Sequence, residues 1–221
     1  MFLTEKKLVT TLKANYASIC HWNTEKFYTK VMEEVDLGFG VADLVISKIK
    51  TIPLNSTESL TYFDAVIYKI IETKKEVSFQ KLKEITKADS TTINRSLNKL
   101  MRDSYINKKD SLISFRKFYK GITSDSIAIE AKLKNWKRAL DQAFRYKWFA
   151  KKSIVVLDSH NIKPALQSID HFKKLNVGLA EIDNSGKLKL HFNPTKNDPI
   201  DYKMWMLLNE ILRKSLFRKK K

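Results

Sequence analysis

The sequence contains very little cysteine, because Cys20 is the single cysteine among 221 residues. One thiol cannot form an intramolecular disulfide or a thiolate cluster for zinc. Histidine is also sparse, and the four histidines lack the close spacing of a zinc ligand set: His21, His160, His171 and His191. The composition therefore argues against disulfide and zinc scaffolds and fits a reducing compartment.

Long apolar runs are missing as well. No run approaches the roughly 20 residues needed to cross a bilayer, and the N-terminus lacks a signal-peptide pattern. The apolar run 154–157 is too short to span a membrane and is typical of a buried strand. We therefore expect a cytoplasmic protein without a membrane partner. No internal repeat, low-complexity segment, helicase motif or methyltransferase motif is visible.

Acidic residues are outnumbered, since 42 Lys and Arg stand against 24 Asp and Glu, a net charge of +18. Such an excess favours a polyanionic partner, and counterion release would make the binding dependent on salt. The alternative is a solvated basic surface with no specific partner. The charge alone points towards nucleic acid.

The middle of the chain has the order of a winged helix-turn-helix. Three amphipathic segments and a short hairpin are predicted in 62–72, from 78, from 89 or 90, and in 105–113. The third helix would present polar side chains to phosphates and base edges: Ser90, Thr91, Thr92, Asn94, Arg95, Asn98 and Lys99. Lys108 and Lys109 would lie at the tip of the wing. The alternative is a protein-interaction module, because many winged helices do not contact DNA.

An acid and a base lie two residues apart in the apolar segment 125–132. Strand alternation places Ile127 and Ile129 on one face, and Glu130 and Lys132 on the other. The two charged side chains would therefore leave the strand in parallel, close enough to act on one water or one metal ion.

A second acid, Asp43, lies in the apolar segment 38–46. An aspartate on one buried strand and Glu-x-Lys on another can form a metal-dependent phosphodiesterase site. The alternative is that Glu130 and Lys132 form a salt bridge at a sheet edge without a catalytic role.

These residues resemble the PD-(D/E)XK nuclease superfamily. Asp43 and the triplet 130–132 (Glu-Ala-Lys) occur in the order of its acidic residue and its (D/E)xK triplet. Gln142 and Tyr146 match the Gln-x-x-x-Tyr signature of the helicase-associated branch. The sequence departs from the pattern at Ala42, which stands in place of the nominal proline.

The resemblance implies an α/β fold with a restriction-endonuclease-like mixed sheet flanked by helices and an inserted winged-helix domain. The nuclease-like core would comprise 1–54 and 118–221, including a basic C-terminal helix. The inserted winged helix-turn-helix would comprise 55–117.

The resemblance also suggests roles for the site residues. Asp43 and Glu130 would bind Mg²⁺ or Mn²⁺ through hard oxygen ligands. Lys132 would orient the attacking water, or deprotonate it if burial and the nearby cation lower its pKa. Gln142 would hydrogen-bond the water or Lys132, with Tyr146 one turn beyond on the same helix face. Gln142 and Tyr146 could instead be polar groups of the core.

A further acid often comes from the first helix or the first strand in this superfamily. Glu5, Glu33 and Glu34 are the candidates, and Glu34 is preferred as a metal ligand because its strand would pair beside Asp43. Basic residues of the helix 136–150, among them Arg138 and Arg145, could hold the DNA strand. The alternative is a solvated helix face on which Asp141 pairs with Arg145.

The sequence thus predicts a metal-dependent nuclease that hydrolyses DNA phosphodiester bonds, with duplex DNA contacted by the winged helix. The rival is a catalytically inactive DNA-binding regulator or adaptor that retains the nuclease fold. RNA is a third substrate to consider, because basic surfaces bind either polymer. A double-strand cut would require two active sites and hence a homodimer. A protein partner from a defence, repair or mobile-element system would also fit.

Overall fold

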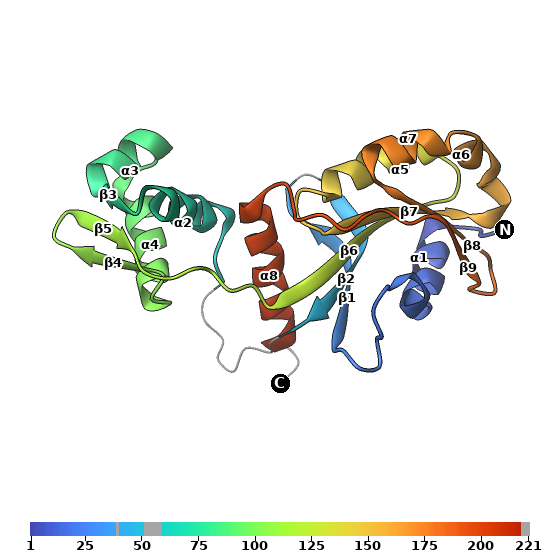
Figure 1. Cartoon of the computed structure of the whole chain (residues 1–221), viewed down its shortest axis with the longest axis horizontal. Coiled ribbons are helices and arrows are strands. Elements are labelled where there is room, and N and C mark those ends of the chain that lie inside the picture. The colour runs from blue at the N-terminus through green and yellow to red at the C-terminus, as the bar shows by residue number, and fades with distance from the viewer. Residues whose placement is uncertain (39, 51–58, 218–221) are drawn as a thin grey trace. The chain divides into compact units, whose positions relative to one another are not determined.

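The computed structural model describes residues 1–38, 40–50 and 59–217. Contacts divide the chain into two compact units (Figure 1), Met1–Thr51 with Thr123–Tyr202 and Ile52–Ile122 with Lys203–Lys221. We call the first the sheet unit and the second the helix-hairpin unit. The boundary expected at Pro53 and residues 55–57 lies outside the described residues.

The sheet unit is built on one mixed sheet of six strands in the order β1-β2-β6-β7-β8-β9. The strands β6, β7 and β8 are parallel, and the other neighbouring pairs are antiparallel. This confirms the predicted α/β class with a mixed sheet. The strand bounds are β1 Thr29–Asp36, β2 Val41–Ile49, β6 Thr123–Lys132, β7 Lys152–Asp158, β8 Gly178–Ile182 and β9 Leu188–Phe192.

One face of this sheet is covered by α1 (Glu5–Ala14). At its start the Thr4 hydroxyl oxygen accepts a hydrogen bond from Lys7 N–H and caps the helix. Its Leu8 and Leu12 are fully buried in the same apolar cluster as residues of β2, β6 and β7. The α-helix ends at Ala14, and a separate 3₁₀ turn covers Tyr16–Ile19, because Asn15 leaves the helical conformation.

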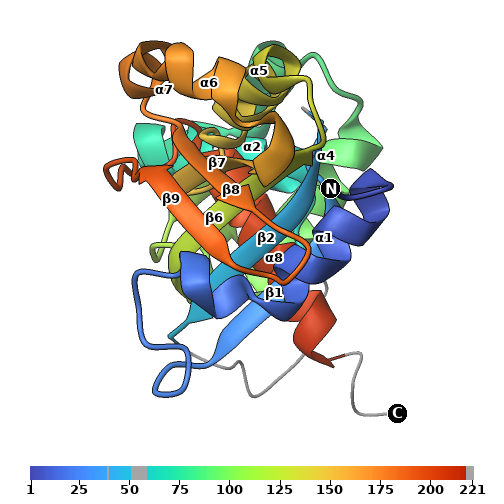
Figure 2. The same ribbon diagram turned by 90° about the vertical axis from the view of Figure 1, so that its right-hand side faces the viewer.

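The opposite face is covered by α5 (Trp136–Tyr146), α6 (Lys163–Gln167) and α7 (Ile169–Leu175), as Figure 2 shows. Helices α6 and α7 are separated at Ser168, where the chain leaves the helical conformation. Helix α5 ends four residues before the expected end at Ala150. With helices on both faces, all seven residues of β7 are buried, as expected for an interior parallel strand.

The helix-hairpin unit contains the three helices and the hairpin expected from the sequence, together with a short strand β3. That strand joins the hairpin in a three-stranded sheet of order β3-β5-β4. The bounds are α2 Tyr62–Lys74, β3 Glu76–Ser78, α3 Phe79–Thr86, α4 Ser90–Arg102, β4 Ile106–Lys109 and β5 Leu112–Phe115.

The C-terminal helix α8 (Tyr202–Phe217) differs from the expectation, because residues from Lys203 onwards group with the helix-hairpin unit. The carboxylate of Glu210 accepts hydrogen bonds from the Leu60 N–H at 3.1 Å and the Tyr119 hydroxyl at 2.7 Å. These long-range bonds tie α8 to the segment before α2 and to the segment after β5. The assignment of all of 118–221 to the nuclease-like core is corrected accordingly.

Among the described residues, none of the helices combines the length and apolar character that a transmembrane segment requires.

Candidate functional site

Antiparallel pairing of β2 with β6 brings the predicted acids together. Leu44 pairs with Ile129, so Asp43 and Glu130 come next in register on the two strands. Leu44 and Ile129 both belong to the apolar cluster beneath α1. Alternation therefore turns the two acids towards the face covered by α5.

The two carboxylates lie in different surroundings. The side chain of Asp43 is 25% exposed, whereas that of Glu130 is 1% exposed. One oxygen of Asp43 accepts a hydrogen bond of 2.7 Å from the backbone N–H of Ala131. The backbone of the triplet therefore fixes the orientation of the carboxylate on the neighbouring strand.

The ammonium group of Lys132 connects three acids. Its Nζ lies 2.9 Å from Glu130 Oε1, 3.3 Å from Glu5 Oε2 and 3.8 Å from Asp43 Oδ2. The Glu5 carboxylate comes from the first turn of α1, so this helix also reaches the site. Three carboxyl groups therefore surround one ammonium group.

Burial raises the pKa of Glu130 and that of Asp43, because the low-dielectric interior disfavours each charged carboxylate. Burial acts to lower the pKa of Lys132, but the hydrogen bond and charge of Glu130 and the charges of Asp43 and Glu5 raise it above its ordinary value. The charges of the protein's own groups therefore favour the protonated form of Lys132. Lys132 is a hydrogen-bond donor in this arrangement.

Helix α5 supplies the next layer of the site. The Tyr146 hydroxyl contacts the Glu130 carboxylate and lies 2.7 Å from the Val41 carbonyl oxygen. Burial, followed by the hydrogen bond to Glu130, raises the pKa of Tyr146 well above its ordinary value. One turn earlier, Gln142 Oε1 is buried and has no hydrogen-bond partner among the described residues. Gln142 can therefore accept a hydrogen bond from a water or a ligand.

The basic residues proposed to hold DNA differ in their relation to the site. Both Arg138 and Arg145 are exposed on α5. Arg145 lies beside the site, because a Cβ placed on Gly40 would be 3.8 Å from its Nη2 and 3.9 Å from Tyr146 Cε1. The φ of +123° at Gly40 is one that favours glycine. Glycine thus permits the turn before β2 to pass close to both side chains.

The three candidates for a further acid are separated by the structure. Glu33 forms an ion pair with Lys13 of α1. The preferred Glu34 is exposed, has φ of 49° and raises the pKa of Asp43 through its charge. Glu5 makes the direct contact with Lys132. Strand pairing favoured Glu34, because the sequence does not show that the first turn of α1 lies close to Lys132.

Metal ligation at this site would rest on few protein groups. No group of three or more His, Cys, Asp or Glu side chains in the described parts of the chain is arranged to hold a metal. The donor chemistry of Asp43 and Glu130 fits Mg²⁺, which often takes one or two carboxylates and completes its shell with water and phosphate oxygens.

Helix α4 of the helix-hairpin unit presents most of the residues expected to contact DNA. The exposed members are Ser90, Thr91, Asn94, Arg95 and Asn98, and the hairpin adds exposed Lys108 and Lys109. Thr92 is half-buried, and its hydroxyl donates to the capping carboxylate of Asp89 at 2.7 Å.

The expectation that Lys99 lies on the outer face of α4 is wrong, because Lys99 is only 8% exposed. Its Nζ lies 3.0 Å from Asp64 Oδ2 of α2, and Ser96 donates to the other Asp64 oxygen at 2.5 Å. Lys99 compensates a buried carboxylate in the core of the unit and is removed from the set of DNA contacts.

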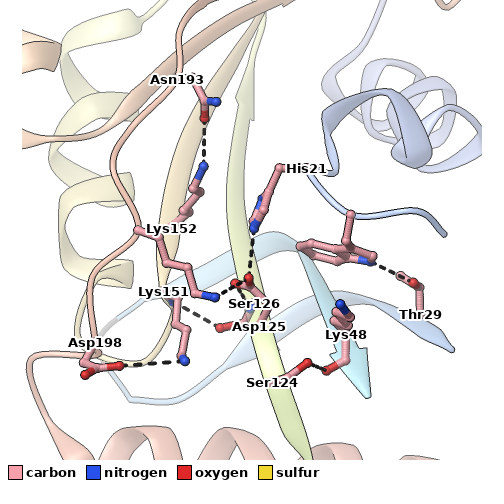
Figure 3. Close-up of polar contacts among 12 residues, drawn as sticks. His21, Thr29, Lys48, Ser124, Asp125, Ser126, Lys151, Lys152, Asn193 and Asp198 are labelled. Carbon is pink, nitrogen blue, oxygen red and sulfur yellow. Dashed lines mark hydrogen bonds and ion pairs between the residues drawn. The ribbon is translucent and has the colours of Figure 1, made fainter. Parts of the chain in front are cut away.

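A second polar cluster lies at the other end of β6 and was missed in the sequence (Figure 3). The buried Asp125 carboxylate lies 2.8 Å from His21 Nε2. It also lies 2.7 Å from Lys196 Nζ. Burial acts to raise the pKa of Asp125, but Lys196 and His21 lower it overall. Nearby, Lys152 Nζ donates to Asn193 at 2.9 Å. These paired charges join segments distant in sequence, which gives the cluster a structural role.

Comparisons of the chain with protein-family models, curated proteins and solved structures found no match. The functional interpretation therefore depends on the chemistry of the residues described above.

Proposed function

We propose that this protein is a metal-dependent nuclease that hydrolyses phosphodiester bonds in DNA. The observation that carries the proposal is the convergence of Asp43, Glu130 and Lys132 from adjacent strands, with Lys132 Nζ 2.9 Å from Glu130 and 3.8 Å from Asp43. A buried carboxylate, a partly exposed carboxylate and an ammonium group on one face match the needs of phosphodiester hydrolysis.

Asp43 and Glu130 would hold Mg²⁺ or Mn²⁺, and Glu5 or Glu34 would act as a further acid through a water ligand rather than by direct contact with the metal. The bound metal would lower the pKa of a water ligand and neutralise charge on the phosphate. Burial of Glu130 and Asp43 favours this use, because each raised carboxyl pKa reflects a charged form that a nearby cation would stabilise.

The protein's own groups would then position the reactants. Lys132 would donate to the attacking water or to a phosphate oxygen, because its ammonium group lies between the carboxylates. Tyr146 would hold the Glu130 carboxylate in place through its hydroxyl. Gln142 Oε1, which lacks a partner within the described chain, would accept a hydrogen bond from the attacking water.

The helix-hairpin unit would act as a winged helix that contacts duplex DNA. Its support is the order of three helices and a hairpin, with exposed Asn94, Arg95 and Asn98 on α4 and exposed Lys108 and Lys109 on the hairpin. A net charge of +18 would strengthen binding to the DNA backbone. Cutting both strands would require a homodimer, or a partner protein that supplies a second active site.

A catalytically inactive DNA-binding adaptor is the second candidate. The observation that favours it is the ion-pair cluster around Lys132, in which Glu5, Asp43 and Glu130 already satisfy the ammonium group. Such a cluster could stabilise the sheet without any chemistry.

The proposed function is tested by incubating purified protein with duplex DNA, single-stranded DNA and RNA in Mg²⁺ or Mn²⁺, beside an EDTA control. Metal-dependent cutting of DNA by the wild-type protein, lost in Glu130→Ala, supports the nuclease, and preferential cutting of RNA would change the substrate. Salt-sensitive DNA binding without cutting of any substrate in either metal supports the adaptor.

A further inference from the structure

The helix-hairpin unit contains a basic and aromatic pocket of about 560 Å³ that is separate from the exposed face of α4. It lies where the chain leaves β5, and one residue of α8 completes its wall. Four of its six lining residues are cationic, two are aromatic and none is acidic: Tyr105, Arg116, Lys117, Phe118, Lys120 and Arg213.

The segment 116–120 that forms most of this wall is held by its backbone and by one buried side chain. Arg116 N–H donates to the Tyr105 carbonyl at 2.9 Å. Tyr119 N–H donates to the Tyr68 hydroxyl at 2.9 Å, and the Tyr119 hydroxyl donates to Glu210 at 2.7 Å. The exposed side chains on either side of Tyr119 are therefore presented from an anchored segment, which lowers the entropic cost of binding a ligand.

The cations of this wall differ in their partners, and the Lys117 ammonium lies 5.1 Å from the centroid of the Tyr105 ring. Arg213 lies 3.5 Å from Glu210 and is largely buried. No ion pair with an acid is found for Arg116, Lys117 or Lys120 in the part of the chain that the structure describes. Three exposed like charges within five residues repel one another. A bound anion would relieve that repulsion.

Phe118 provides an open aromatic surface at this pocket, because 61% of the residue is exposed. Phe115 packs against it edge-on, with ring centroids 5.0 Å apart and an interplanar angle of 63°. The Lys75 ammonium lies 5.4 Å from the Phe118 ring centroid. Phe118 is therefore supported by its neighbours while most of its surface remains open to solvent, which is suitable for stacking.

We propose that this pocket binds an unpaired nucleotide of a single-stranded nucleic acid. The base stacks on Phe118, and Arg116, Lys117 and Lys120 contact the adjoining phosphates. Aromatic side chains in a positive groove are the recurring means of holding single strands. Duplex bases fit the pocket poorly, because their faces are covered by their neighbours in the stack. The inference goes beyond the proposed function, since it concerns binding and requires no cleavage.

The test measures fluorescence anisotropy of a labelled 12-nucleotide oligothymidine, an abasic strand of equal length and a duplex, all in EDTA. We expect Phe118→Ala to weaken oligothymidine binding by about tenfold and to leave abasic-strand binding unchanged. Phe27→Ala is the matched control, because Phe27 is 43% exposed and also lies beneath a lysine ammonium, that of Lys48. We expect that control to bind all three ligands as the wild-type protein does.

The contribution of the lysines of the pocket wall is tested by a separate measurement. Lys117→Gln and Lys120→Gln should each weaken oligothymidine and abasic-strand binding alike, and reduce the slope of log K against log salt by about 0.7. Lys81→Gln, which removes a lysine already paired with Glu84 at 2.8 Å, should change neither.

Two results would overturn the proposal. One is that Phe118→Ala binds oligothymidine with wild-type affinity, since stacking would then be absent. The other is that poly-glutamate of equal charge displaces oligothymidine as well as unlabelled oligothymidine does, since the pocket would then accept acidic protein segments. Because these measurements are made without metal, a failure of cleavage would leave their outcome unchanged.

Discussion

The carboxylate of Asp43 accepts a hydrogen bond of 2.7 Å from the backbone N–H of Ala131, in the middle of the triplet 130–132. The last backbone pair of β2 and β6 towards this site is Leu44 with Ile129, so the pairing stops before Asp43 is reached. The Asp43 side chain thus occupies the position where the next backbone partner would lie. The end of a strand pair and the proposed site are the same structural feature.

Lys99 is expected to matter for stability rather than for DNA binding. Removal of its ammonium group in Lys99→Met leaves the buried Asp64 carboxylate without its 3.0 Å ion-pair partner. Breaking such a pair costs about 3 kcal/mol or more. Urea unfolding should show that loss, while the salt slope of DNA binding by the folded variant stays at the wild-type value. Asn98→Ala, one residue away and exposed, should change the free energy of unfolding by about 0.5 kcal/mol or less.

The buried carboxylate of Glu130 should give the protein a specific pH dependence. Burial raises the pKa of Glu130 above its ordinary value of 4.5. A carboxyl group with a raised pKa in the folded state stabilises the protein fully below the unfolded pKa, and that contribution is lost as the pH rises through the folded pKa. The free energy of unfolding of the wild-type protein, relative to Glu130→Gln, should therefore fall above pH 4.5.

This comparison is made by chemical unfolding at intervals from about pH 4 to about pH 7. Glu25→Gln, at an exposed position, serves as the control and should track the wild-type protein throughout. A difference between wild type and Glu130→Gln that stays constant, or that grows in favour of the wild type with pH, would contradict the assigned effect of burial.

Substitution of Gln142 distinguishes a catalytic role of this residue from a role in packing. Its Oε1 is buried without a hydrogen-bond partner in the described part of the chain, so Gln142→Met removes a polar atom that contributes little to stability. We expect an unchanged or higher melting temperature, together with a kcat lowered by about tenfold or more. If the variant cleaves DNA at the wild-type rate and has the same melting temperature, Gln142 is a core residue without a catalytic role.

Arg95 should contribute to duplex binding through α4, where it is exposed. Arg95→Ala is expected to weaken binding and, if the contact is to phosphate, to reduce the slope of log K against log salt by about 0.9. Lys83→Ala, at an exposed position on α3, is the control. Equal effects of the two substitutions would mean that α4 has no special place in the interface.

Local patterns in the sequence were sufficient for most elements of the fold. Alternation through 125–132 indicated a buried strand, and Asp89 does cap α4 through Thr92 N–H. The same alternation placed Glu130 and Lys132 on one face. The order of three helices and a hairpin in the helix-hairpin unit followed from periodicity.

The predictions that failed depend on contacts between residues that are distant in the sequence. Lys99 was expected to be exposed because a polar residue on an amphipathic helix gives no sign of a buried acid 35 residues earlier. Helix α8 was assigned to the sheet unit because its bonds with Leu60 and Tyr119 are invisible in the sequence. The direct approach of Glu5 to Lys132 spans 127 residues, which explains why pairing arguments favoured Glu34 instead.

The most direct measurement is the initial rate of supercoiled-plasmid cleavage in Mn²⁺ for four proteins: wild type, Asp43→Asn, Lys132→Gln and the exposed control Glu25→Gln. The proposal predicts cutting by the wild type and the control, and a loss of about 100-fold or more in each site variant, with all four proteins folded by circular dichroism. Equal rates in all four, or no metal-dependent cutting by the wild type, would contradict catalysis at this cluster.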